Sequence, residues 1–172
     1  MKNIISTENI DILLKYLPIF ESDKFNSIDE KLLKEDNLPF MLCYSEEINN
    51  FVKDFYKSNL VYNFNWSEWQ NEALKYFENP ELLQNADIEI IRKLLTLHVR
   101  KERFCEGHLI DIIDSKHIVE ILKRLKQIRE DMSSNKSLER NIWPYGSNIS
   151  QLSRYVSTKA PSLELSGFYK QK

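Results

Sequence analysis

The stretch Val99–Leu109, VRKERFCEGHL, decides how the centre of this chain folds, because it directly follows the strongest helical pattern in the sequence. Asp87 is a typical N-cap, and apolar residues recur at helical spacing after it. On a helical wheel, the residues expected on the buried face are Ile88, Ile91, Leu94, Leu95, His98 and Val99. Those expected on the narrow opposite face are Arg92, Lys93, Thr96, Arg100 and Arg103.

A single straight helix through this stretch is unfavourable. It would be longer than about 25 residues and would hold Gly107 in its interior, which is unusual in a globular domain. It would also turn Glu102 and Glu106 into the core, where an unpaired carboxylate is costly. We therefore predict a break between Lys101 and Phe104 that turns the two carboxylates toward basic partners and lets another backbone approach the glycine closely.

The rest of the chain indicates further helices. Periodic apolar residues predict helices over residues 7–17, with Thr7 as the cap and Pro18 as the stop, and over 118–129, after a tight turn at 115–117. Another is predicted between the cap Ser45 and the left-handed terminator Asn59. A further turn is expected around residues 28–33. These segments predict an all-α fold, a single compact bundle of about five to six helices.

The clearest helix start lies at Asn65. Glu68 follows at the position of a reciprocal capping partner, and Phe64 and Trp69 occupy the two positions of a hydrophobic staple. The helix is expected to run to about Glu78, before an Asn-Pro pair. A structural role for these tryptophans is favoured over stacking on a base or sugar.

Composition sets the limits of function. The chain has 172 residues, 42% of them hydrophobic and 29% charged, which suits one globular domain over residues 1–131, followed by a polar, irregular tail over 132–172. The formal net charge of −2 provides no general attraction to nucleic acid or to a membrane. No apolar run is long enough to span a bilayer, no signal-peptide pattern occurs, and the two cysteines are isolated, so we expect a cytoplasmic protein.

The cysteine and histidine of the quoted stretch permit two chemical roles. Cys105 and His108 have a spacing that occurs in zinc sites, and Cys43, His98 or His117 could complete the ligands. No second paired motif exists, so we predict no metal. Cys105 could also act as a nucleophile with His108 as its base, although nothing in the sequence identifies a third group to orient them.

The arginines of the same region suggest anion binding. Arg92, Arg100 and Arg103 share one helical face, and the planar guanidinium fork suits carboxylates and phosphates. The leading hypothesis is a non-enzymatic interaction or regulatory domain that uses this face to hold an acidic protein or a phosphate-bearing ligand. The alternative is an enzyme acting on a nucleotide or nucleic acid, with Glu106 and His108 as general acid and base beside the arginines.

Two further interpretations concern helix pairing. The turn at 115–117 joins two helices with the spacing of a helix-turn-helix, and Lys123, Arg124, Lys126 and Arg129 follow on the second helix, yet the overall charge does not favour DNA binding. Alternatively, an internal network fixes the angle between the two helices. In that case we expect Glu106 to pair with an arginine of the stretch, and Arg92 to be the most exposed arginine of the face.

Several motifs in fixed order resemble the DUF6508 family, a bacterial family of unknown function. They are Phe64-x-Trp66-x-x-Trp69, Ala86-Asp87, Arg92-Lys93-Leu94-Leu95-Thr96, Arg100-x-x-Arg103-Phe104-Cys105-Glu106-Gly107-His108-Leu109, His117-Ile118 and Ile121-Leu122-Lys123-Arg124-Leu125. The resemblance covers about residues 38–129 and implies a small, mostly helical cytoplasmic domain. It supplies no catalytic assignment, and we expect no cofactor. Such sequences often carry glycine where this chain has Lys116.

Overall fold

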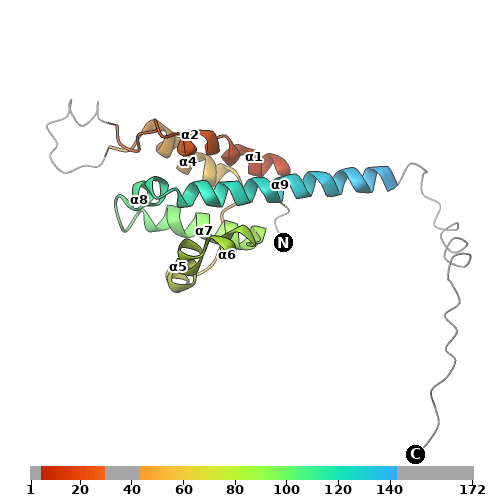
Figure 1. The fold of residues 1–172 in the computed structure, drawn as a ribbon. Coiled ribbons are helices and arrows are strands. Elements are labelled where there is room, and N and C mark those ends of the chain that lie inside the picture. The colour runs from red at the N-terminus through yellow and green to blue at the C-terminus, as the bar shows by residue number, and fades with distance from the viewer. Residues whose placement is uncertain (1–4, 30–42, 143–172) are drawn as a thin grey trace, which may run out of the picture. The chain divides into compact units, whose positions relative to one another are not determined.

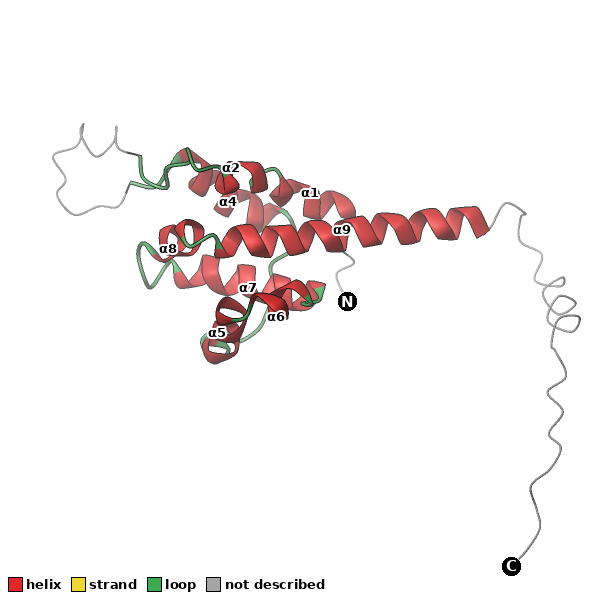
Figure 2. Cartoon of the chain, in the orientation of Figure 1, coloured by secondary structure: helices red, strands yellow, loops and turns green. Residues whose placement is uncertain are grey.

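A computed structural model describes residues 5–29 and 43–142 of the chain, with side chains as far as Ser134. These residues form eight helices and one isolated β-bridge, between Ile28 and Tyr44, so the predicted all-α fold is confirmed (Figures 1 and 2). The helices are α1 (Thr7–Leu14), α2 (Leu17–Glu21), α4 (Glu46–Lys57), α5 (Gln70–Glu78), α6 (Pro80–Gln84), α7 (Ile88–Lys101), α8 (His108–Asp114) and α9 (His117–Ile142). The turn expected around 28–33 falls mostly outside the described residues.

The chain divides into two units, residues 1–136 and 137–172, and the site described below lies in the first. Helix α9 was expected to end near Arg129, but it continues to Ile142, eleven residues into the segment predicted to be irregular. Ile128 and Met132 pack against the core as partly buried residues, which explains why the helix persists past the end of its strong apolar pattern. The remainder of the predicted tail, residues 143–172, lies outside the described residues.

The first predicted helix is two helices. Ser6, not Thr7, caps α1: its hydroxyl accepts the N–H of Asn9 at 3.3 Å, and the Asn9 side chain accepts the Ser6 N–H at 3.0 Å. Pro18 was predicted to stop the first helix. It lies in the first turn of α2, where the missing N–H of proline leaves no hydrogen bond unmade.

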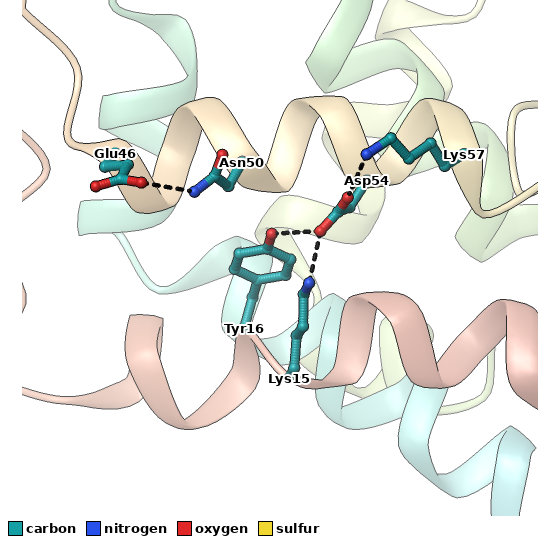
Figure 3. A network of polar contacts seen from close by, with 6 residues as sticks. All are labelled: Lys15, Tyr16, Glu46, Asn50, Asp54 and Lys57. Carbon is teal, nitrogen blue, oxygen red and sulfur yellow. Dashed lines mark hydrogen bonds and ion pairs between the residues drawn. The ribbon is translucent and has the colours of Figure 1, made fainter.

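A buried tyrosine and an aspartate join this region to α4 (Figure 3). Asp54 accepts the Tyr16 hydroxyl at 2.7 Å and pairs with Lys15 at 2.6 Å and with Lys57 at 3.4 Å. The hydrogen bond from Lys15 and that from Tyr16 lower the pKa of the Asp54 carboxyl to about 2. The network ties the end of α1 to the middle of α4.

Helix α5 starts later than predicted. Its N-terminal boundary is Trp69 and its first residue is Gln70, because residues 66–69 form turns. Asn65 does not cap the helix, since its side-chain oxygen accepts the hydroxyl of Ser67 at 2.8 Å. The aromatic contact expected of the staple is present: the rings of Phe64 and Trp69 meet edge to face at 5.7 Å.

Helix α7 forms the centre of the core and is buried on nearly every side. Asp87 caps it as predicted, accepting the Ile90 N–H at 2.9 Å. Thr96 was expected on an exposed face but is fully buried, and its hydroxyl accepts the Tyr62 N–H at 2.9 Å. The narrow polar face predicted for this helix is therefore largely covered by the rest of the domain.

The predicted break is confirmed: α7 ends at Lys101, and α8 begins at His108 after a turn. Gly107, the residue before α8, has a φ of 89°, a conformation in which a Cβ atom is strained. Lys116 adopts the same region between α8 and α9, with a φ of 64°. Its ammonium group donates to the carbonyl of Phe20 at 3.0 Å, a contact that glycine could not make.

Candidate functional site

The chain's three histidines meet at one place in the fold. His98 comes from α7, His108 is the first residue of α8, and His117 is the first residue of α9. His98 Nδ1 lies 3.0 Å from His108 Nε2, with the two rings stacked at 5.2 Å between centroids. The His98 and His117 rings meet edge to face at 5.3 Å.

Burial keeps these imidazoles neutral near neutral pH. It lowers the pKa of His98 well below its ordinary value, and positive charge on the other two histidines or on Lys101 would lower it further. Burial also lowers the pKa of His117 to about 4 and lowers that of His108. The cluster therefore presents neutral rings, each with one donor and one acceptor nitrogen.

Two nitrogens of the cluster are buried without a hydrogen bond among the described residues. They are Nε2 of His98 and Nε2 of His117. A buried polar atom without a partner costs about 1–3 kcal/mol, and such atoms are few in folded proteins. The His117 ring at least packs on Phe77, with 5.0 Å between centroids. The His98 ring instead borders open space, although its Nε2 itself has almost no accessible surface.

That space is a pocket of about 170 Å³ formed by α5, α7 and α8. The residues that line it are Gln70, Ala73, Leu74, Phe77, Leu97, His98, Lys101, His108 and Ile112. Most are apolar, and the ones that carry hydrogen-bonding or charged groups include two histidines and one lysine. An apolar pocket with a few convergent polar groups is the usual form of a small-molecule site.

A carboxylate fixes the turn that places His108. Glu102 accepts the Gly107 N–H at 3.0 Å and the Leu109 N–H at 2.6 Å, and it also accepts the Tyr44 hydroxyl. The same hydroxyl accepts the Gly107 N–H at 2.9 Å. Burial and the hydrogen bond to Glu102 raise the pKa of Tyr44 to about 12. The expected lock between two helices exists, but backbone N–H groups and a tyrosine form it in place of arginines.

The predicted role of Glu106 as this lock is wrong. Its side chain is exposed, and no ion pair among the described residues joins it to Arg100 or Arg103. The carboxylate that turns inward is Glu102, because it lies at the end of α7, within reach of the first free N–H groups of α8.

Arg92 is not the most exposed arginine of its face. Its guanidinium donates to the carbonyls of Leu60 at 3.0 Å and Val61 at 2.9 Å, and it lies 5.1 Å from the centroid of the Tyr62 ring. Burial lowers its pKa from the ordinary value. The arginine thus holds the segment that links α4 to α5. Its guanidinium donors are already used by backbone carbonyls of that segment.

The other predicted site residues do not line the pocket. Arg103 is exposed over the ring of Tyr56, at 5.6 Å, and Arg100 is half-buried. Cys105, the candidate nucleophile, is exposed. Of the five predicted site residues, only His108 lines the pocket.

The described residues contain no group of three or more histidine, cysteine, aspartate or glutamate side chains placed to hold a metal ion. The three histidines meet mainly ring to ring, and the Nε2 of His108 is used by His98. That the protein carries no zinc stays a prediction.

Three of the four basic residues noted on α9 are engaged within the domain, whereas Lys126 is exposed. Lys123 pairs with Glu21 at 3.0 Å, and Arg124 donates to the carbonyl of Ala86 at 2.8 Å. Arg129 forms two hydrogen bonds to Asp11, at 2.9 and 3.0 Å. These contacts explain why cations follow one another along this helix without reference to DNA.

Sequence reasoning missed Lys101 and underrated His98. The wheel placed His98 on the buried face, which is correct, but a histidine there is ordinarily a satisfied core residue. The signal that could have singled it out is the position of the chain's other two histidines, each at the start of a later helix. Only packing shows that these helix starts meet.

The fold and site define a small all-α domain with a pocket lined in part by the buried His98 and the half-buried His108. Within the described residues, no helix combines the length and apolar character needed to cross a bilayer. The chain belongs to the family of unknown function DUF6508, which matches residues 5–131. The match confirms the resemblance seen in the motifs and extends it to α1 and α2. The chain matches no curated protein and no solved structure.

Proposed function

We propose that this domain binds a small molecule in the pocket between α5, α7 and α8, which we name the histidine pocket. The observation that carries the proposal is His98, a buried side chain that borders the pocket and has an unpartnered Nε2. That nitrogen has almost no accessible surface in this structure, so a ligand reaches it only when the ring or a neighbouring lining side chain rotates slightly; a hydrogen bond from the ligand would then remove the cost of its burial. The apolar lining would shelter the remainder of the ligand.

The proposal keeps a non-enzymatic binding function but moves it away from the arginine face. Arg92 is committed to backbone carbonyls, so the face lacks one of its three members. Arg100 and Arg103 lie outside the lining of the pocket. An interaction or regulatory role remains the best description, with the ligand as the signal and the helices around the pocket as the responding element.

Catalysis in the same pocket is the second candidate. His98 and His108 share a hydrogen bond of 3.0 Å, a geometry that can pass a proton between a ligand and solvent. This alternative keeps His108 as the general base but not Glu106, which is exposed and outside the lining. Turnover of a bound compound, abolished in His108→Gln with binding retained, would favour it over binding alone.

The test is a titration of the full chain with three single-ring probes: benzyl alcohol, benzamide and benzoate. Imidazole nitrogen chemical shifts report directly on the three histidines. At least one probe is expected to move the His98 signal in a saturable manner. If none of the three moves it at millimolar concentration, the histidine pocket is not a ligand site.

Two matched leucines provide the control. Leu74 is 50% exposed and lines the pocket, whereas Leu82 is 37% exposed and lies on α6 outside the lining. A tryptophan at position 74 should cover the opening, so Leu74→Trp is expected to weaken binding. Leu82→Trp should leave it unchanged. Equal binding in both variants would place the probe somewhere else.

A further inference from the structure

We propose that the histidine pocket takes a small carboxylate that bears one apolar group, such as a single-ring aromatic acid or a short branched aliphatic acid. The inference rests on the proposed function and names the ligand class of the same site. Three features of the pocket support it: its volume, the charge on its lining, and the arrangement of its hydrogen-bonding groups.

The volume limits the ligand to about one ring. A closed apolar cavity of about 150 Å³ accommodates benzene, and drug-sized ligands occupy pockets of roughly 300–1,000 Å³. The histidine pocket measures about 170 Å³. Nucleotides and peptides are therefore too large to be enclosed, whereas a ring or branched chain with one small polar group fits.

The charge on the lining is positive. Lys101 lines the pocket, and no acidic side chain is among the residues that do. Within the described residues, Lys101 forms no ion pair. Glu102 and Asp111 act on His108 from nearby, but Glu102 is satisfied by backbone N–H groups and neither lines the pocket. An anionic ligand would thus supply the missing countercharge.

The two histidines and the lysine of the lining lie together on one side. His98 and Lys101 are three residues apart on α7 and so share a helical face, and His108 is hydrogen-bonded to His98. The α5 side is mainly apolar, with Ala73, Leu74 and Phe77; its one polar residue, Gln70, donates to the carbonyl of Ser67 at 3.2 Å. A ligand with a carboxylate at one end and an apolar body at the other matches this division.

One tautomer of the histidine pair suits a carboxylate. When His108 donates its Nε2–H to Nδ1 of His98, the proton of His98 sits on Nε2, which has no other partner among the described residues and becomes a donor once it is opened to the pocket. A carboxylate has only acceptors, so it would select this tautomer and accept from His98 while pairing with Lys101. His98 Nε2 and the ammonium group of Lys101 would then both contact the carboxylate of the ligand.

Benzoate and benzamide test the charge, because they have nearly the same shape. Wild-type protein is expected to bind benzoate at least about tenfold more tightly, with a dissociation constant that rises with salt. The His98 nitrogen signals should report a proton on Nε2 in the complex. Equal affinities for the two probes would overturn the carboxylate inference and leave the proposed function standing, whereas the failure of every probe overturns both.

Lys101 is tested by substitution. Lys101→Met keeps the aliphatic stem and should reduce the preference for benzoate about tenfold, with Lys101→Arg restoring most of it. Lys126→Met is the matched control, since Lys126 is exposed on α9 and does not line the pocket. An unchanged preference in Lys101→Met, with a native spectrum, would overturn the inference. A loss of equal size in Lys126→Met would do so too, because it would reduce the effect to net charge.

Discussion

The carboxylate of Glu102 accepts the backbone N–H of Leu109 at 2.6 Å, so the last turn of one helix caps the first turn of the next. The bond spans the break in the helical pattern and, with the bond to Gly107, sets where α8 begins. His108 stands between the two anchored residues. The geometry of the histidine pocket therefore depends on a carboxylate that does not line it.

Glu102→Gln should destabilise the domain. A glutamine side chain has one acceptor oxygen, so one of the two N–H groups would face an NH₂ group, and the bond to Tyr44 would lose its charge. We expect a loss of about 1.5–3 kcal/mol in a denaturant titration. Glu106→Gln, an exposed control in the same turn, should change stability by less than about 0.5 kcal/mol. The reverse ranking would restore Glu106 as the lock.

Arg92→Ala should also destabilise the fold. The change removes donors to the carbonyls of Leu60 and Val61 and the packing on Tyr62, for a loss of about 1–3 kcal/mol. Arg92→Lys should recover little, because an ammonium group cannot reproduce the fork. Arg103→Ala, at an exposed position, should fall within about 0.5 kcal/mol of wild type. A thermal unfolding series compares the three variants, and a stable Arg92→Ala would free this arginine for a ligand.

The histidine cluster should make stability depend on pH. In the unfolded chain histidines take up protons near pH 6.5, while burial lowers the pKa of His98 and His117 in the folded chain, the latter to about 4. The unfolded state then binds more protons than the folded state. The free energy of unfolding is therefore highest above about pH 7 and falls as the pH drops. His117 alone should cost about 2 kcal/mol between pH 7 and pH 5.

His117→Phe provides the check on this dependence. Whatever its effect at pH 7, the variant should have a free energy of unfolding that changes less between pH 7 and pH 5. The slope of that free energy against pH should be smaller by up to roughly one proton. The low pKa of Asp54 does not interfere, because its contribution is lost only as the pH falls from about 4 toward 2. A variant with the wild-type slope would mean that His117 titrates normally in the folded chain.

Two of the three partners of Asp54, Tyr16 and Lys15, should differ in how much they stabilise the fold. Tyr16 is buried and donates to Asp54 at 2.7 Å, so Tyr16→Phe should cost about 1 kcal/mol or more by leaving the carboxylate short of a donor. The side chain of Lys15 is 57% exposed, and Lys15→Met should cost under about 0.5 kcal/mol despite a distance of 2.6 Å. Chemical denaturation separates the two, and an equal loss would show that the ion pair matters as much as the tyrosine.

The C-terminal boundary should lie beyond Met132. A chain that ends at Lys136, the last residue of the first unit, should unfold at the wild-type midpoint. A chain that ends at Asp131 should melt lower, because it loses the contacts of Met132 with the core and the part of α9 beyond Asp131. Calorimetry of both truncated chains is sufficient. A large drop in the melting temperature of the longer chain would mean that residues after 136 stabilise the domain.

Interactions between residues close in the sequence determine much of the secondary structure of this protein. The all-α class, the cap at Asp87, the left-handed Asn59 and the break after Lys101 all follow from propensities and spacings that act within a few residues. The motifs were also enough to indicate the family. Such features are readable from sequence because the interacting groups are neighbours in the chain.

Only the tertiary structure decided which polar groups turn inward and what they meet. A helical wheel gives Arg92 and Thr96 an outer face, but the segment after α4 packs against that face and provides carbonyls and an N–H for them. His98, His108 and His117 are separated by 10 and 9 residues in sequence and belong to three helices. Their meeting depends on how α7, α8 and α9 pack, and packing is set by the whole core at once, which no local pattern records.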